Sequence, residues 1–250
     1  MNGVSLYYEE HGEGAAILGV HGAGSSAVFW ADGARELAKR GRTIVYDRRG
    51  HFRSERPEPY ATNVHENADD AAGLIEALEA APAIVIGRSY GGAVAVDLTL
   101  RYPELVRGLA LLEGDVPSMS ETAAQEWARL EELAADGAER VLRFVLGEGW
   151  ESMPEAAKKI FVDNGPALVA ELRGGYPPVT AEQLGSINRP LLLVGAKDSE
   201  LDYAETIERM SAALPSARVA WVEGGHAIDP ANPVVLDFID EVLAEPRRTG

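Results

Sequence analysis

The sequence contains no cysteine. Disulfide bonds, thiolate nucleophiles and thiolate metal ligands are therefore all excluded. The histidine and carboxylate residues do not follow the spacing of a metal site either. We expect a protein that uses no metal and no other cofactor.

Basic residues are scarce. The chain has 23 Lys and Arg against 40 Asp and Glu, which gives a net charge of −17. Binding of nucleic acid needs a clustered basic surface, and docking on anionic lipid needs one too, so we expect neither partner. The net negative charge indicates either that repulsion between like-charged molecules keeps the protein soluble, or that its host organism is adapted to salt.

Long apolar runs are absent as well. No run approaches the roughly 20 residues of a membrane-spanning helix. The opening MNGVSLYYEEHGEG is acidic and lacks the basic and then apolar segments of a secretory signal. We therefore expect a soluble cytoplasmic protein that acts on a small molecule. The sequence does not distinguish a monomer from a homodimer.

What the sequence does contain is an alternation of apolar runs and helical stretches. The runs indicate strands buried on both faces: AAILGVHG, TIVYDRRG, AIVIGRS, LALLEGD, LLLVGAKD and RVAWVEGGH. Helical patterns occupy residues 33–41, 67–80, 92–104, 204–215 and 233–245. This order predicts an α/β fold with a mostly parallel sheet, in which VSLYYEE is an antiparallel edge strand.

Residues 115–185 interrupt the alternation. They show no convincing strand, and helix signals occur at 120–137, 138–149, 154–165 and 166–175. The segment holds 13 acidic and 6 basic residues, a net charge of −7. It is too long for a simple crossover, so we expect a helical insertion between two strands. Crossover helices extended by chance are the alternative.

A lone serine marks the centre of the chain. Ser89 lies in GRSYG, with the spacing G-x-S-x-G, after an apolar run and before a helical stretch. A serine in such a tight turn takes strained backbone angles and projects from the carboxyl edge of the sheet. The alternative is a glycine-rich turn with an incidental serine, so the prediction depends on partners for Ser89.

A neutral serine needs a base, and a base needs an acid that fixes its tautomer. Of the five histidines, only His226 follows a late apolar run; His51 and His65 are expected in loops or on the surface, and His21 is expected to brace a loop. Asp198 follows the preceding run, and it is the preferred acid. Its rivals are Glu113, Asp115 and Asp202.

A tetrahedral oxyanion also needs two donors. The backbone amide of Tyr90, at the start of the helix after Ser89, is one candidate. The amide of Ala23, in LGVHGAGSSAVFW, is the other. The glycines of this loop do not form a phosphate-binding motif, because no lysine follows them.

The motifs HGAGSSAVFW, YDRRGHFRS, GRSYGG, GAKD and GGHAIDPANP together resemble the α/β-hydrolase superfamily over essentially the whole chain. The resemblance implies an eight-stranded sheet with a helical cap inserted after the sixth strand. The cap is expected at 115–185 and the hydrolase core at 1–114 and 186–250. It also implies Ser89 as nucleophile, His226 as base, Asp198 as acid, and the Ala23 and Tyr90 amides as oxyanion hole. A serine, rather than an aspartate, argues against haloalkane dehalogenases and epoxide hydrolases.

Arg88 departs from the family, which has a neutral polar residue or histidine before the nucleophile. A buried guanidinium is costly unless it is paired, and Glu113 and Asp115 are the expected partners.

In the cap, large apolar residues are expected to line the substrate pocket: Trp127, Phe144, Trp150 and Phe161. An acidic lid and a paired Arg88 favour a neutral, moderately hydrophobic substrate.

These features predict a serine hydrolase, most simply a carboxylesterase that works through an acyl-enzyme. The same groups also serve cleavage of amides, lactones and carbon–carbon bonds, and cofactor-free perhydrolysis, which the fold does not separate. A ligand receptor with slow turnover on the same scaffold is a hypothesis of another class. Ordinary turnover of a short acyl ester distinguishes it from an esterase.

Overall fold

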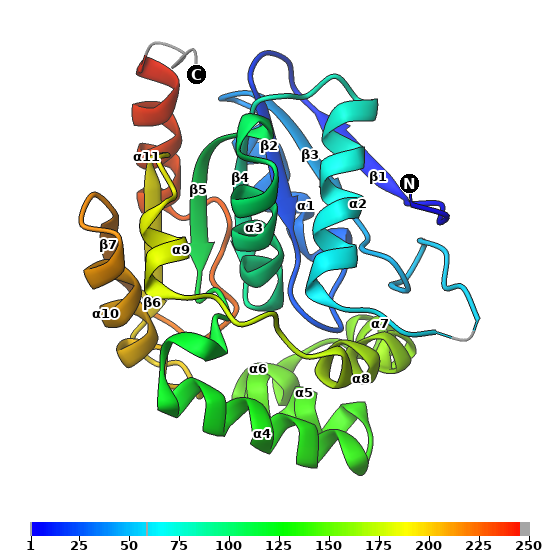
Figure 1. The fold of residues 1–250 in the computed structure, drawn as a ribbon. Helices are drawn as coiled ribbons and strands as arrows, with labels where there is room; N and C mark the ends of the chain where they lie inside the picture. Colours follow the sequence, from blue (N-terminus) through cyan, green and yellow to red (C-terminus); the bar gives the residue numbers. More distant parts are fainter. Residues whose placement is uncertain (1, 59, 246–250) are drawn as a thin grey trace.

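A seven-stranded sheet forms the centre of the computed structural model, which describes residues 2–58 and 60–245 (Figure 1). The strands are β1 (Tyr8–His11), β2 (Ala16–Val20), β3 (Arg42–Tyr46), β4 (Ala83–Arg88), β5 (Val106–Leu112), β6 (Leu191–Ala196) and β7 (Arg218–Val222). Their order is β1-β3-β2-β4-β5-β6-β7, and only β1 runs antiparallel to its neighbour. The predicted parallel sheet and antiparallel edge strand are confirmed. The described residues form seven strands instead of eight, so the helical insertion follows the fifth.

Helices cover both faces of the sheet. Helices α1 (Ala31–Leu37) and α11 (Pro233–Ala244) pack on one face, against side chains such as Ile84 and Ile86 of β4. On the other face, α2 (Val64–Ala77), α3 (Tyr90–Arg101) and α10 (Ala204–Ala213) pack against side chains that include Val85. Because neighbouring residues of a strand point to opposite faces, a run such as AIVI supplies both cores.

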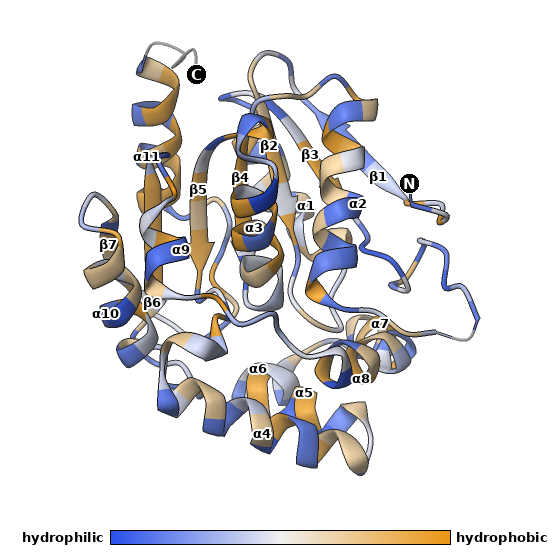
Figure 2. Ribbon diagram, in the orientation of Figure 1, coloured by the Kyte–Doolittle hydropathy of each residue, from blue (hydrophilic) through white to orange (hydrophobic). Residues whose placement is uncertain are grey.

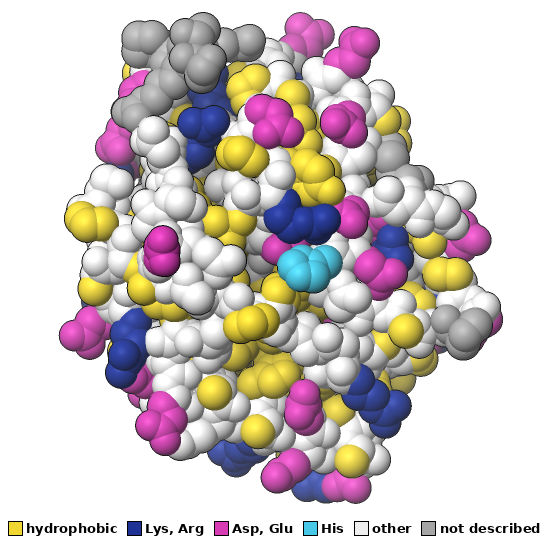
Figure 3. All heavy atoms as spheres, viewed as in Figure 1, with side chains coloured by type: hydrophobic (Ala, Val, Ile, Leu, Met, Phe, Trp, Pro, Cys, Tyr) yellow, Lys and Arg dark blue, Asp and Glu magenta, His cyan; other side chains and the backbone are white. Residues whose placement is uncertain are grey.

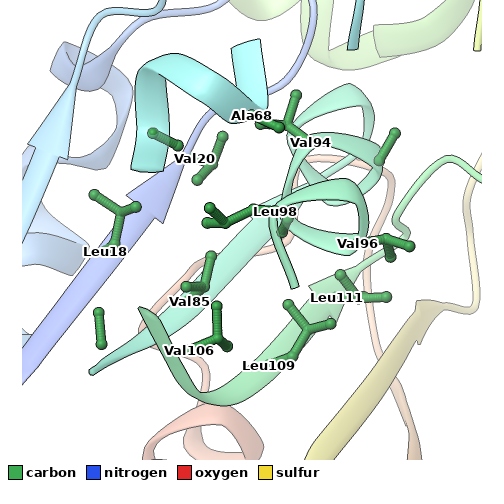
Figure 4. Packing of buried hydrophobic residues seen from close by; sticks show 14 of the residues in the cluster. Leu18, Val20, Ala68, Val85, Val94, Val96, Leu98, Val106, Leu109 and Leu111 are labelled. Atoms are coloured by element: carbon green, nitrogen blue, oxygen red, sulfur yellow. The ribbon is translucent and has the colours of Figure 1, made fainter. Parts of the chain in front are cut away.

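The larger core lies between β4, β5 and helices α2 and α3. Figure 4 shows Val85, Leu109 and Leu111 pointing from the strands toward Val94 and Leu98 of α3. In Figure 2 the central strands are coloured as hydrophobic, whereas the outer helices mix hydrophobic and hydrophilic residues. Helix α2 begins where the side chain of Asn63 accepts a hydrogen bond from the amide of Glu66, at 2.9 Å. This cap satisfies a donor that the first helical turn leaves free.

The insertion forms its own helical layer at the edge of the sheet where β4 and β5 end (Figure 1). Its helices are α4 (Glu121–Ala135), α5 (Ala138–Leu146), α6 (Glu148–Ser152), α7 (Glu155–Asp163) and α8 (Gly165–Gly174). Ser120 caps α4 by accepting a hydrogen bond from the amide of Ala123 at 2.9 Å. The layer has a core of its own, which contains Trp150 and Phe161. Helix α9 (Ala181–Gly185), still inside the expected cap range, packs against α10.

A buried ion pair joins the insertion to the sheet. Arg48, which follows β3, pairs with Glu171 of α8, and both side chains are fully buried. The same guanidinium donates to the backbone carbonyls of His21 and Gly22, each at 3.0 Å. His51 lies in the loop after β3, one of the two places expected, but it is not on the surface, because its ring is fully buried beside this pair. The loops after β2 and β3 therefore meet the insertion around one cation.

Replacing Arg48 by methionine is expected to lower the free energy of unfolding by about 3 kcal/mol or more. The change leaves the buried carboxylate of Glu171 without its cation and the buried carbonyl of His21 without the donor that Arg48 supplies. Urea unfolding followed by circular dichroism measures the loss. The matched control is Arg140→Met, because Arg140 pairs with Asp136 at the surface, where an ion pair contributes about 1 kcal/mol or less. Equal losses in the two variants would contradict the assignment.

The face drawn in Figure 3 carries acidic and basic side chains scattered among apolar ones, without a continuous basic area. No helix in the described part of the chain combines the length and the apolar character that a bilayer crossing requires.

Candidate active site

Ser89 occupies the tight turn between β4 and α3. Its backbone angles are φ 53° and ψ −126°, a conformation that residues with a side chain rarely take, so the predicted strain is confirmed. The flanking glycines are required by crowding. A Cβ atom on Gly87 would lie 2.4 Å from the carbonyl oxygen of Gly91, and one on Gly91 would lie 2.2 Å from that of Val20. The turn is therefore pressed against the end of β2.

His226 lies in the loop after β7 and contacts a different acid from the one expected. Its Nδ1 lies 2.7 Å from Oε2 of Glu113, a buried side chain directly after β5. Glu113 also accepts hydrogen bonds from the amide of Ala196 and the hydroxyl of Ser199, both at 2.9 Å. Three donors thus fix this carboxylate, and the carboxylate fixes the orientation of the imidazole.

The placement of Asp198 against His226 is therefore wrong. Asp198 is exposed, and its carboxylate accepts a hydrogen bond from the amide of Gly224 at 3.2 Å. Asp198 lies beside the loop of His226, since its amide donates to the carbonyl of Gly224 at 3.0 Å, but its carboxylate turns to the Gly224 amide instead of the imidazole. Glu113 reaches the imidazole from the end of β5, with a backbone φ of 44°. Asp202, the other rival on that loop, is exposed too.

A second carboxylate lies on the other side of Ser89. The Oγ atom of Ser89 donates a hydrogen bond to Oδ2 of Asp115 at 3.3 Å. Two tyrosine hydroxyls donate to the same carboxylate, that of Tyr176 at 2.9 Å and that of Tyr203 at 2.6 Å. Burial raises the pKa of Asp115, while these hydroxyls and His226 oppose the rise. The ring of Tyr203 stacks on His226, with centroids 5.4 Å apart.

The loop after β2 approaches Ser89 from the sheet side. A Cβ atom on Gly22 would lie 3.2 Å from Cβ of Ser89, and the next residue, Ala23, lines the same cavity. His21 holds this loop, since its Nδ1 donates to the carbonyl of Gly22 at 2.8 Å and its Nε2 accepts from the amide of Arg48 at 2.9 Å. Burial and the Arg48 charge hold the pKa of His21 well below its usual range, so the ring stays neutral.

Arg88 pairs with neither of its expected partners. Its guanidinium donates to the backbone carbonyl of Ile228 at 3.2 Å and lies 5.7 Å from the ring centre of Trp30. Burial lowers the pKa of Arg88 to about 10, and attraction to Asp229 opposes the fall, so the side chain is charged at neutral pH. Because Ile228 is two residues beyond His226, Arg88 ties the histidine loop to the nucleophile strand.

A cavity of about 390 Å³ opens above Ser89 and His226. The insertion lines it with apolar side chains, which include Trp127, Leu130, Val141, Leu142, Phe161 and Leu168. Trp127 and Phe161 thus lie where the sequence predicted them. Phe144 and Trp150 do not line the cavity: Trp150 is fully buried in the core of the insertion, and the Phe144 ring lies 4.1 Å from the Arg129 guanidinium. The wall that the insertion provides therefore consists of two of the four predicted aromatic residues together with aliphatic ones such as Leu130, Val141 and Leu142.

The model of one protein family, the alpha/beta hydrolase family, matches residues 17–237. The chain belongs to the α/β hydrolase family. The hydrolase is 31% identical to the inferred carbamate hydrolase RutD of Azorhizobium caulinodans, over 95% of this chain and 93% of the relative. It is 28% identical to the 2-(acetamidomethylene)succinate hydrolase of Mesorhizobium japonicum, over 95% and 92%. Among solved structures, a thermophilic esterase from Thermogutta terrifontis superimposes with a TM-score of 0.80 at 24% identity, covering 96% of this chain and 94% of that one.

The hydrolase also uses residues that sequence reasoning did not single out. Tyr176 follows α8 and Tyr203 precedes α10, and neither lies in a recognisable motif. Their role becomes visible only because both hydroxyls meet Asp115. In the described part of the hydrolase, residues 2–58 and 60–245, no three histidine or carboxylate side chains are grouped as metal ligands.

Replacing Glu113 by glutamine is expected to lower kcat for a p-nitrophenyl ester by roughly 10⁴-fold, as loss of a triad carboxylate does. The amide no longer holds the imidazole in the tautomer that can take a proton from Ser89. Initial rates at saturating ester measure the loss. Asp198→Asn, which changes a carboxylate on the neighbouring loop, is expected to leave kcat nearly unchanged. A larger effect at Asp198 than at Glu113 would reverse the assignment.

Proposed function

We propose that the protein is a serine hydrolase that cleaves a carboxylic ester of a small molecule through an acyl-enzyme. One observation supports this most directly: the His226–Glu113 hydrogen bond of 2.7 Å lies beside the strained Ser89, beneath a cavity lined by the cap. A strained nucleophile turn, a base and a fixed acid are the parts that acyl transfer needs.

In the proposed reaction, Ser89 turns from Asp115 toward Nε2 of His226 and gives up its proton as it attacks the ester carbonyl. Glu113 stabilises the imidazolium that forms. The proton then passes from His226 to the leaving oxygen, and an alcohol departs. Water activated by His226 attacks the acyl-enzyme and releases the acid. No described contact joins Ser89 to His226 before substrate binds, so this rotation is the first step.

The amides of Ala23 and Tyr90 are the proposed oxyanion donors. Tyr90 begins α3, where the partial positive charge of the helix N-terminus adds to the stabilisation. Ala23 follows Gly22, whose close approach to Ser89 brings this loop to the nucleophile. The neutral His21 and the Arg48 guanidinium both bind carbonyls of the loop, so the donor is held in place before the reaction begins.

The cavity favours a neutral, moderately hydrophobic substrate. Its side chains include three carboxylates, Asp32, Asp115 and Asp229, against one permanent cation, Arg88. Arg88 is held by the carbonyl of Ile228 and attracted to Asp229, so part of its capacity to bind an anion is already used. The apolar wall from the insertion suits an acyl or aryl group.

Cleavage of a carbamate or an amide is the second candidate. The relatives named above support it, since one is an inferred carbamate hydrolase and the name of the other contains an acetamido group. The Ser89, His226 and Glu113 groups serve these bonds by the same steps, with an amine as leaving group when the bond is an amide. The two candidates differ in one group of the substrate: a secondary amide or carbamate carries an N–H bonded to the scissile carbonyl carbon, and an ester does not.

Ser89→Ala is expected to lower kcat for a p-nitrophenyl ester by about 10⁶-fold, because no other group can form the acyl-enzyme. A fluorophosphonate probe followed by peptide mass spectrometry is expected to label Ser89 alone. Unchanged circular dichroism would show that the variant still folds. Labelling of another serine, or retained activity in Ser89→Ala, would reject the mechanism, and a labelled protein without turnover would favour a ligand receptor.

Neutral esters are expected to have a kcat/KM at least about tenfold higher than that of their free-carboxylate analogues, a difference of about 1.4 kcal/mol. The acidic residues around the cavity repel an anion on approach. The measurement compares an ester with its monoacid analogue at low and high salt, and the difference is expected to shrink as salt rises. A preference for the monoacid at low salt would show that Arg88 governs the site.

A further inference from the structure

Asp115 is a carboxylate beside the nucleophile that the proposed acyl-transfer steps do not use. It is fixed there by the backbone, because its amide donates to the carbonyl of Ser89 at 3.0 Å. Glu113, two residues earlier, has φ 44° and binds His226. A Cβ atom on Gly92 would lie 2.4 Å from Cα of Gly114, so the turn between the two carboxylates is packed against α3. The end of β5 thus directs one carboxylate to the base and the other to the nucleophile.

The partners of Asp115 are all neutral. In the part of the chain that the structure describes, no lysine or arginine forms an ion pair with it, and three hydroxyls serve as its donors. Asp115 is partly exposed and lines the cavity. Of the three donors, the two tyrosines are held by aromatic packing, with Tyr176 against Trp127 and Tyr203 against His226. Ser89 is the donor that must leave when the reaction begins.

The departure of Ser89 frees an acceptor at the reaction centre. When Ser89 gives its proton to His226, Oδ2 of Asp115 keeps the hydrogen bond from Tyr176 and loses the one from Ser89, which leaves one acceptor position of the carboxylate open toward the cavity. The vacated position lies next to Oγ, where the atoms bonded to the scissile carbonyl carbon arrive as the new bond forms. A substrate that places a donor there restores the lost bond during acyl transfer, when it lowers the barrier most.

We propose that Asp115 accepts a hydrogen bond from an N–H group bonded to the scissile carbonyl carbon. A nitrogen bonded to that carbon can carry a donating hydrogen while the compound as a whole stays neutral and can still be cleaved. The favoured substrates are therefore those of the second candidate, carbamates and secondary amides, and this inference rests on the acyl-enzyme steps of the proposed function. For a carbamate ester, the Oγ–C bond forms, the C–O bond breaks, and the Ser89 proton passes through His226 to the alcohol. Water then releases carbamic acid and restores Ser89.

The kinetic test compares compounds with and without the N–H. One pair is p-nitrophenyl N-methylcarbamate and N,N-dimethylcarbamate, and the other is p-nitroacetanilide and its N-methyl derivative. The two pairs place the N–H on the acyl and the leaving side, respectively. The ratio of kcat/KM within a pair is expected to fall about tenfold in Asp115→Asn, which loses a charge-assisted hydrogen bond. Differences in intrinsic reactivity cancel, because the same pair is compared across variants.

Asp202→Asn is the matched control, since Asp202 is an exposed aspartate of the loop that precedes α10, and its ratio is expected to stay that of the wild type. A merely structural role for Asp115, such as support of the Tyr203 ring on His226, would lower both members of each pair equally. An unchanged ratio in Asp115→Asn for both pairs would overturn the proposal. A change confined to one pair would support it and show on which side of the carbonyl the N–H lies.

A binding measurement covers the cases in which Asp115→Asn fails to fold or turnover is absent. Ser89→Ala removes the competing hydroxyl and leaves Asp115 with a vacant acceptor position. Calorimetric titration of this variant with p-nitroacetanilide is expected to give at least about fivefold tighter binding than titration with its N-methyl derivative. Equal affinities would contradict the proposal for Asp115. Absence of fluorophosphonate labelling at Ser89 in the wild type would instead contradict the proposed function, so the two failures are distinguishable.

Discussion

The close contact between the Ser89 turn and the backbone of its neighbours is the constraint on which the rest of the site depends. Gly91 allows the turn to approach the carbonyl of Val20, and Gly92 allows α3 to approach Gly114. Side chains at these positions would move α3 away from the sheet. Because the turn cannot relax, Ser89 keeps its left-handed backbone angles, and the ends of β2 and β5 are held next to it.

The same crowding places the two carboxylates at the end of β5. The glycine contact between α3 and the end of β5 holds Glu113 next to His226 and Asp115 next to Ser89. Asp198 follows β6, which lies between β5 and the strand that leads to His226, yet its carboxylate pairs with the amide of Gly224. Which carboxylate meets the histidine thus follows from how the loops at the strand ends pack, and strand order alone does not decide it.

The insertion contributes shape and charge, whereas the proposed reacting groups Ser89, His226 and Glu113 all follow strands of the sheet. It provides the apolar wall of the cavity and Tyr176, and it is fastened by the buried Arg48–Glu171 pair. The same Arg48 binds the loop that carries Ala23, so attachment of the insertion and placement of the proposed oxyanion donor share one side chain. A change in the insertion is therefore expected to affect catalysis as well as substrate choice.

The sequence by itself determined the class of fold and the strained turn at Ser89. Buried strands are encoded by uninterrupted apolar runs, so the parallel sheet and its edge strand could be predicted from the local pattern. The G-x-S-x-G spacing between a strand and a helix is compatible with few backbone conformations, so the strained conformation of Ser89 could be predicted too. His226 could be placed at the site because it too follows an apolar run, and the carboxyl ends of parallel strands meet at one edge of the sheet.

Only the tertiary structure decided which carboxylate meets His226. Glu113, Asp115 and Asp198 all follow apolar runs, and their distances to the histidine depend on strand order and on backbone turns that no local pattern records. The same holds for the partner of Arg88, for the burial of His51, and for the choice of Trp127 and Phe161 over Phe144 and Trp150 as cavity walls. Each of these depends on how helices and loops pack from distant parts of the chain, which side-chain chemistry alone does not specify.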